Sequence, residues 1–189
     1  MLYISRGEIS SEDSFKVLFR GEDIFLTCEE WELWKKGLNN FVIGANSRFT
    51  STYDLLYSLA EKGLVCISEG GSGDLCYDRY MLLTKTMLVY KPQRLVIFPK
   101  GTERFIFSWM KAASISLTTE ELVFLVENNI PPSKELSGEK NKAALISKLY
   151  PDGKIEDNIL IKRMSHAKNR DLVVATVLSM LNKGFLVLN

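Results

Sequence analysis

The stretch LTCEEWELW, residues 26–34, decides how the first half of the chain folds, because it carries the signals of a helix start. The Thr27 hydroxyl can accept a hydrogen bond from the backbone N–H of Glu30. The Glu30 carboxylate can accept one from the N–H of Thr27, and the two bonds together form a capping box. The pattern therefore predicts a helix that begins at Thr27, with Trp31 and Trp34 on one face.

A similar phrase, LTTEELVFL at residues 117–125, occurs later in the chain. A second similarity connects SLAEKGLV, residues 58–65, with SMLNKGFLV, residues 179–187. Each half thus predicts a capped acidic helix, a helix that ends in Lys-Gly, and a strand. Two copies of one unit usually pack about a pseudo-twofold axis. Two interpretations stay open: an internal duplication, and the residue pattern that any two amphipathic helices share.

The segments around these helices predict further elements of both types. We expect the glycine-rich EGGSGD, residues 69–74, at the tip of a hairpin or loop. DRYMLLTKTMLVY, residues 78–90, fits a helix or a strand, and we favour a helix that ends before Pro92. The other expectations are a strand in FKVLFRG (15–21), a helix in STYDLLYSLAEKG (51–63), a β-hairpin in RLVIFPKGTERFIFSW (94–109), helices over 139–149 and 171–183, and a final strand.

These elements predict an α+β fold in which helices pack on an antiparallel β-sheet. We expect two winged-helix-like or pseudo-twofold-related halves, residues 1–92 and 93–189. The N-terminal half would hold a strand, two or three helices and the hairpin tip, and the C-terminal half a β-hairpin, helices and the last strand. One compact domain with internal pseudo-symmetry is the alternative.

Composition favours no obligate charged partner. The 24 basic and 23 acidic residues almost cancel, and 46% of the residues are hydrophobic, which is enough for a core. No apolar run has the length of a membrane span, and the N-terminal residues lack the pattern of a signal peptide. The 3 cysteines are too few and too irregular for a disulfide framework. We therefore expect a cytoplasmic protein.

No group of residues in the sequence has the pattern of a catalytic or metal site. The three cysteines have no C-x-x-C spacing, and zinc sites need clustered thiolates or imidazoles. His166 is the single histidine and has no acidic residue near it in the sequence to orient it. The GGSG segment lacks the lysine of a phosphate-binding loop. We therefore expect a protein that is not an enzyme and that holds no metal and no cofactor.

Two groups of residues are candidates for binding a partner. Trp31 and Trp34 can pack in the core, or they can serve as exposed anchors for a protein partner. The segment KRMSHAKNR, residues 162–170, is basic and lacks any acidic residue, so it can contact phosphates or an acidic protein surface, unless it is simply a solvated loop. Its four cations are Lys162, Arg163, Lys168 and Arg170.

The order of a helix, a helix ending in L-x-x-K-G-L-V, a strand and a glycine-rich tip resembles the winged-helix pattern of many bacterial regulators. That resemblance implies DNA binding through the second helix of each pair. The first such helix, residues 51–62, offers Tyr53, Asp54, Tyr57, Ser58 and Glu61, with one lysine at its end. This is a poor set of side chains for phosphates and base edges.

A second resemblance covers residues 25–109. The order FLTCEEWELW, LLYSLAEKGLV, a Gly-rich turn, YMLLTKTMLVYKPQRLVIF and ERFIFSW is similar to that of EspG-type chaperones of type VII (ESX) secretion systems and their Firmicutes relatives. The resemblance implies a cytoplasmic, cofactor-free chaperone that binds small secreted helical-hairpin substrates and keeps them soluble.

We therefore expect a non-enzymatic protein-binding adaptor or chaperone, with a tandem winged-helix DNA-binding regulator as the alternative. The near-zero net charge and the acidic second helix favour the protein partner. Homodimerisation through an edge strand or the final helix stays open.

Overall fold

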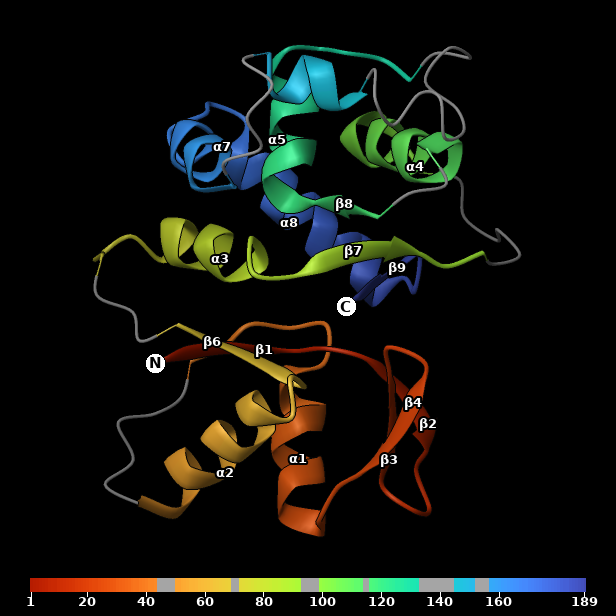
Figure 1. The fold of residues 1–189 in the computed structure, drawn as a ribbon, viewed down its shortest axis with the longest axis vertical. Helices are drawn as coiled ribbons and strands as arrows, with labels where there is room; N and C mark the ends of the chain where they lie inside the picture. The colour runs from red at the N-terminus through yellow and green to blue at the C-terminus, as the bar shows by residue number, and fades with distance from the viewer. Residues whose placement is uncertain (44–49, 69–71, 93–98, 114–115, 133–144, 152–156) are drawn as a thin grey trace. The chain divides into compact units, whose positions relative to one another are not determined.

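The computed structural model describes residues 1–43, 50–68, 72–92, 99–113, 116–132, 145–151 and 157–189. Helices and antiparallel sheets form the fold, so the predicted α+β class is confirmed (Figure 1). The chain divides into two compact units. Unit 1 comprises Met1–Thr86 with Val187–Asn189, and unit 2 comprises Met87–Leu186. The division thus follows Thr86, whereas the sequence suggested a boundary after residue 92.

The first sheet of unit 1 forms around the N-terminal strand. β1 (Leu2–Ser5) lies between β5 (Val42–Ile43) and β6 (Val65–Ser68) and is antiparallel to both. Tyr3 lies opposite Val42 on one side and opposite Ile67 on the other. All of β1 is buried, which is typical of a strand covered on both faces.

A second sheet in unit 1 is an antiparallel meander of β2 (Glu8–Ser11), β3 (Lys16–Phe19) and β4 (Glu22–Phe25), with β3 in the middle. Arg20 and Gly21 connect β3 to β4 with φ angles of 52° and 86°. Positive φ at both central residues is typical of a type I′ turn, whose twist matches that of the flanking strands. The strand predicted in FKVLFRG is therefore one half of a hairpin.

Three described helices complete unit 1: α1 (Cys28–Gly37), α2 (Thr50–Glu61) and α3 (Leu75–Leu83). The predicted capping box opens α1. The N–H of Glu30 donates to Thr27 Oγ1 at 3.2 Å, and the N–H of Thr27 donates to Glu30 Oε2 at 3.0 Å. Both α1 and α3 pack against β1. The helices predicted around residues 27–38 and 51–63 are thus confirmed.

Two expectations about the chain after β6 need correction. β6 pairs with β1, and the next described element is α3, which Asp74 caps by accepting two backbone N–H groups at its start. The described end of EGGSGD, residues 72–74, is a loop that leads into α3, so the loop alternative holds there and the hairpin alternative does not, while residues 69–71 lie outside the described part. The helix predicted over 78–90 is also too long, because α3 ends at Leu83 and a strand begins at Met87.

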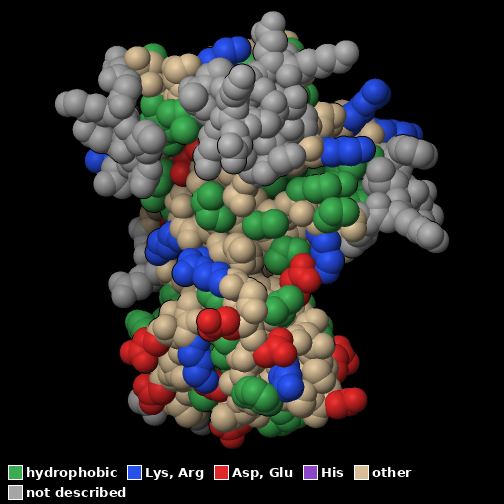
Figure 2. All heavy atoms as spheres, turned by 45° about the vertical axis from the view of Figure 1, so that its right-hand side comes forward, with side chains coloured by type: hydrophobic (Ala, Val, Ile, Leu, Met, Phe, Trp, Pro, Cys, Tyr) green, Lys and Arg blue, Asp and Glu red, His purple; other side chains and the backbone are tan. Residues whose placement is uncertain are grey.

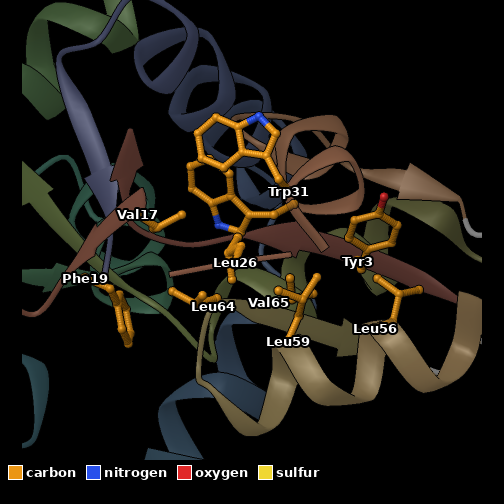
Figure 3. Close-up of a cluster of buried hydrophobic side chains, with 10 residues drawn as sticks. Tyr3, Val17, Phe19, Leu26, Trp31, Leu56, Leu59, Leu64 and Val65 are labelled. Atoms are coloured by element: carbon orange, nitrogen blue, oxygen red, sulfur yellow. The ribbon is translucent and has the colours of Figure 1, made fainter. Parts of the chain in front are cut away.

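The core of unit 1 gathers side chains from both sheets and from α1 and α2 (Figure 3). The indole N–H of Trp34 donates to the carbonyl oxygen of Arg6 at 2.9 Å, and Trp31 stacks on Trp34 with ring centres 5.4 Å apart. The Tyr3 hydroxyl donates to the carbonyl oxygen of Leu33 at 3.2 Å. The other buried members are Val17, Phe19, Leu26, Leu56, Leu59, Leu64 and Val65.

Unit 2 begins with β7 (Met87–Tyr90), which pairs with β8 (Leu117–Thr118). The strand order of this sheet is β8-β7-β9, and β9 (Leu186–Leu188) begins at the last residue of unit 2. The helix predicted over 171–183 is confirmed, and 145–149 is helical as expected, while 139–144 lie outside the described residues. The described helices are α4 (Gly101–Ala113), α5 (Thr119–Glu127), the short helix over 145–149, α7 (Asp157–Met164) and α8 (Arg170–Asn182).

The hairpin predicted over residues 94–109 is wrong where the structure describes it, since Gly101 begins the helix α4. Residues 93–98 lie outside the described part. Short apolar runs fit a strand or a buried helix, and here the burial has helical spacing: Ile106, Trp109 and Met110 are all buried. The indole N–H of Trp109 donates to the carbonyl oxygen of Ile130 at 2.8 Å, which fixes α4 on the chain that follows α5.

The two units share a local arrangement that involves the Lys-Gly helix ends. In unit 1, Ser58 Oγ and Lys62 Nζ both donate to Glu30 Oε1, at 2.9 Å and 2.5 Å. In unit 2, Ser179 and Lys183 donate in the same way to Oε1 of Glu103, at 2.7 Å and 2.5 Å. The similarity between residues 58–65 and 179–187 therefore extends to side-chain contacts.

The other similarity, between LTCEEWELW and LTTEELVFL, is confirmed only as a repeated capping box. Thr118 and Glu121 cap α5 as Thr27 and Glu30 cap α1. The carboxylate that binds the Ser and Lys pair of unit 2 belongs to Glu103 in α4, however, and not to Glu121. In this contact, α4 is the counterpart of α1.

Candidate interaction surface

Trp31 and Trp34 are core residues of unit 1. Their side chains are only 3% and 0% exposed, so neither can act as an exposed anchor in this structure. The core alternative holds because each ring has an apolar neighbour, and because the indole N–H of Trp34 finds its acceptor inside the unit.

The four cations of the basic segment do not form one exposed group. Lys162, Arg163 and Lys168 are exposed, and Arg170 is half-buried. Arg163 also places its guanidinium carbon 5.0 Å from the centre of the Phe124 ring. Arg170 donates to the side chain of Asp171 and to the backbone carbonyl of Ser165, both at 2.7 Å. Two of the four side chains therefore help to hold unit 2 together.

The helices that a winged-helix interpretation would place in a DNA groove carry few cations. On α2 and its end, the exposed side chains are Ser51, Asp54, Tyr57, Glu61 and Lys62. On α8 and its end they are Asp171, Leu172, Ala175, Asn182 and Lys183. Base edges and phosphates are read mainly by Arg, Lys, Asn and Gln, so neither described face is typical of a recognition helix.

Glu30 with Ser58 and Lys62 has the residue types of a catalytic site but not the geometry. Both Ser58 Oγ and Lys62 Nζ donate to the same carboxylate oxygen, so the lysine does not serve as a base for the serine. Burial raises the pKa of Glu30, but the hydrogen bonds from Lys62, the Thr27 backbone and Ser58 outweigh it, and the net pKa is lowered. The group is therefore a salt bridge with an added hydrogen bond, and it connects α1 to the end of α2.

Cys66 is a structural thiol. Burial raises its pKa, although the positive charges of Arg6 and Lys85 act in the opposite direction. A thiol with a raised pKa is mostly protonated at neutral pH and is a weak nucleophile. Among the described residues, no group of three or more His, Cys, Asp and Glu side chains is placed to hold a metal ion.

The exposed side of the meander carries two large apolar side chains that face solvent. Residues opposite one another in an antiparallel pair point to the same face, and Lys16 lies opposite Phe25, as Leu18 lies opposite Asp23. Phe25 is 64% exposed and Leu18 is 41% exposed, whereas Val17 on the other face is buried in the core. We call this side the meander face; its members are Glu8, Ser10, Lys16, Leu18, Asp23 and Phe25.

Contacts across the meander face fix its polar side chains. Ser10 donates to the carboxylate of Asp23 at 2.6 Å, and Lys16 Nζ lies 4.6 Å from the centre of the Phe25 ring. The sequence patterns considered above did not indicate this surface. The Arg-Gly pair between two short apolar runs was the available signal, since two residues that can take positive φ predict a tight hairpin.

Unit 1, which carries the meander face, is acidic. It has 9 Lys and Arg against 13 Asp and Glu, a formal charge of −4, while unit 2 has 15 against 10, a charge of +5; the two sum to the +1 of the whole chain. In the lower part of Figure 2, which shows unit 1 from the meander side, acidic side chains are spread between hydrophobic ones. The meander face thus presents exposed apolar side chains on a unit whose formal charge is negative.

Comparisons with protein-family models, with curated proteins and with solved structures find no match to this chain. The described helices include none that is both long and apolar enough to cross a membrane.

Proposed function

We propose that this chain is a non-enzymatic adaptor or chaperone that binds a protein partner through the meander face. The observation that carries the proposal is the pair of exposed apolar side chains, Phe25 and Leu18, on a sheet face with acidic neighbours. Large apolar groups that face solvent together are typical of protein-binding surfaces, and aromatic side chains contribute strongly to such interfaces.

The substrate class follows from the resemblance to EspG-type chaperones. On that basis the partner is a small helical secretion substrate of a type VII system, which the adaptor keeps soluble. The absence of a described metal cluster is compatible with a purely binding role but is not evidence for it.

Site-specific photo-crosslinking in the native cell tests the proposal. We would place p-benzoylphenylalanine at Phe25 and, as a matched control, at Ile159, which is also well exposed but lies on α7 in unit 2. A defined protein crosslinked from position 25 and not from position 159 is the expected result. Equal, unspecific crosslinking from both positions, or no crosslinked protein, would overturn the proposal.

DNA binding through unit 2 is the second candidate. The observation in its favour is the formal charge of +5 on that unit, with Lys162 and Lys168 exposed. Mobility-shift titrations at two salt concentrations test it, because each phosphate contact makes affinity fall as salt rises. Salt-dependent binding that weakens in Lys162→Gln and Lys168→Gln variants would favour this candidate, and no shift at micromolar protein would exclude it.

A further inference from the structure

β4 leaves one edge of the meander open. It lies at the end of the order β2-β3-β4, and β3 is its strand neighbour among the described residues. The N–H of Leu26 donates to the carbonyl oxygen of Phe15 at 3.0 Å, which fixes which residues point toward β3. Because the direction alternates along a strand, the N–H and C=O groups of Asp23 and Phe25 point away from β3 and toward solvent.

The other edge of the meander is less suited to accept a strand. The register between β2 and β3 shifts between Ile9 and Ser11, which marks a bulge or irregularity. Bulges twist an edge and are one of the ways in which proteins block unwanted strand pairing. The pairing of β3 with β4 has no register shift, from the pair of Lys16 with Phe25 to the pair of Phe19 with Glu22. The β4 edge is therefore regular along its whole length.

The charges on β4 select the kind of strand that can join it. Glu22 and Asp23 lie side by side on this edge strand, and both are exposed. Pairing of β4 with a second copy in the register that sets Asp23 opposite Asp23 would bring carboxylates together, which is destabilising. A strand with basic residues at the matching positions would instead place opposite charges across the pair.

We propose that β4 binds an extended segment of the partner protein as an added antiparallel strand, with an apolar residue opposite Phe25 and a basic residue opposite Asp23. These two partner residues are separated by one position, so both side chains lie on the meander face. Backbone hydrogen bonds to Asp23 and Phe25 supply affinity, and the apolar and acidic positions supply specificity. This inference rests on the proposed function, and it adds the conformation and chemistry of the bound segment.

A designed peptide tests strand addition directly. Its core reads Phe-Val-Lys-Lys, so that an antiparallel alignment places Phe opposite Phe25 and the lysines opposite Asp23 and Glu22. The control peptide carries Phe-Val-Glu-Glu. In NMR titrations with backbone hydrogen exchange, we expect the basic peptide to protect the amides of Asp23 and Phe25, while the amide of Ile24, which points toward β3, changes little. The acidic peptide should bind at least about tenfold more weakly.

A pair of variants separates the backbone bond from the side chain. Asp23→Ala removes the carboxylate but keeps the N–H, whereas Asp23→Pro removes both. Proline is tolerated on an edge strand where the N–H faces solvent, so the fold should persist, as circular dichroism would verify. We expect the peptide to bind Asp23→Pro about tenfold more weakly than Asp23→Ala, which corresponds to the loss of a backbone hydrogen bond.

Equal affinity of the two variants, or protection of neither outward amide in the unsubstituted protein, would overturn strand addition. The amide measurement needs no variant, so the inference stays testable if Asp23→Pro does not fold. A specific crosslink from position 25 combined with failure of the peptide tests would leave the proposed function standing and reject the extended mode, in favour of contact through a helix of the partner. If neither the crosslink from position 25 nor peptide binding is observed, both the proposed function and strand addition are rejected.

Discussion

Lys62, which follows the last residue of α2, donates a hydrogen bond of 2.5 Å to the carboxylate of Glu30 in the first turn of α1. Glu30 is almost fully buried, while Lys62 is about one-third exposed. The same carboxylate accepts hydrogen bonds from Ser58 and from the N–H of Thr27. One acidic side chain therefore both caps α1 and fixes α2 against it.

The first prediction concerns the amide replacement Glu30→Gln. Glutamine has one acceptor oxygen, so it cannot satisfy both the N–H of Thr27 and the donors of Ser58 and Lys62. We expect a loss of about 1–3 kcal/mol in the free energy of unfolding, measured in urea. Glu29→Gln, at an exposed position of the same helical turn, is the control and should change it by less than about 0.5 kcal/mol. Equal losses in both variants would contradict the role given to Glu30.

The second prediction concerns acid. The pKa values of Glu30 and Glu103 are both lowered in the folded protein: burial alone raises them, but the hydrogen bonds from Lys62 and Lys183 and the other donors outweigh it. A group with a lowered folded pKa stabilises the protein above its unfolded pKa and loses that contribution as pH falls. We expect the free energy of unfolding to drop as pH falls below the ordinary glutamate value of 4.5.

A double variant, Glu30→Gln with Glu103→Gln, is the test of that assignment. It removes both lowered carboxyl groups, so its unfolding free energy should depend less steeply on pH in the acid range than that of the unsubstituted protein. Urea titrations at a series of pH values would measure the slope. An unchanged slope would mean that other carboxylates control acid stability.

The sequence specified elements that carry a local cap better than elements without one. Thr27 and Glu30 form a capping box within a single turn, so the start of α1 can be predicted from neighbouring residues alone. The segment that holds Ile106 and Trp109 gave an apolar run without a nearby cap, and the choice between strand and helix there depends on what the run packs against.

The candidate surface was harder to predict than the fold. Phe25 and Phe19 belong to one hairpin, yet Phe25 is mostly exposed and Phe19 is buried. Which face of a two-sided sheet meets the core is set by register and by distant elements, and a shift of one residue reverses it. The burial of Trp31 and Trp34 also depends on distant elements, because the meander and β1 are the neighbours that cover them.

The third prediction uses those two tryptophans as a matched pair. Trp34→Phe removes the hydrogen bond from the indole to the Arg6 carbonyl and leaves a void in a fully buried site. We expect it to lower the free energy of unfolding by about 2–4 kcal/mol. Trp31→Phe keeps an aromatic ring against Trp34 and removes no described indole hydrogen bond, so its loss should be about half as large. Denaturant titration followed by far-ultraviolet circular dichroism measures both, since tryptophan fluorescence changes in each variant.

The fourth prediction runs against helix propensity. Gly37 is the last residue of α1, where alanine ordinarily stabilises a helix by up to about 1 kcal/mol. A Cβ atom at this position would lie 2.5 Å from Ser5 Oγ and 2.6 Å from the Tyr3 ring, both of which are buried in β1. Gly37→Ala should therefore destabilise the protein by about 1–3 kcal/mol, as expected for overpacking.

Lys36→Ala is the control for Gly37→Ala, because it places an alanine at the exposed neighbouring position of α1. Its midpoint of thermal unfolding should stay within about 2 °C of the unsubstituted value, whereas that of Gly37→Ala should fall by several degrees. Ser5→Ala combined with Gly37→Ala removes the Oγ atom that the new methyl group would meet. It should recover only part of the loss, because the Ser5 hydroxyl also donates to the carbonyl oxygen of Trp34 at 2.6 Å. A Gly37→Ala protein as stable as the Lys36→Ala control would show that α1 can move away from β1 at no cost, which the close packing at Gly37 argues against.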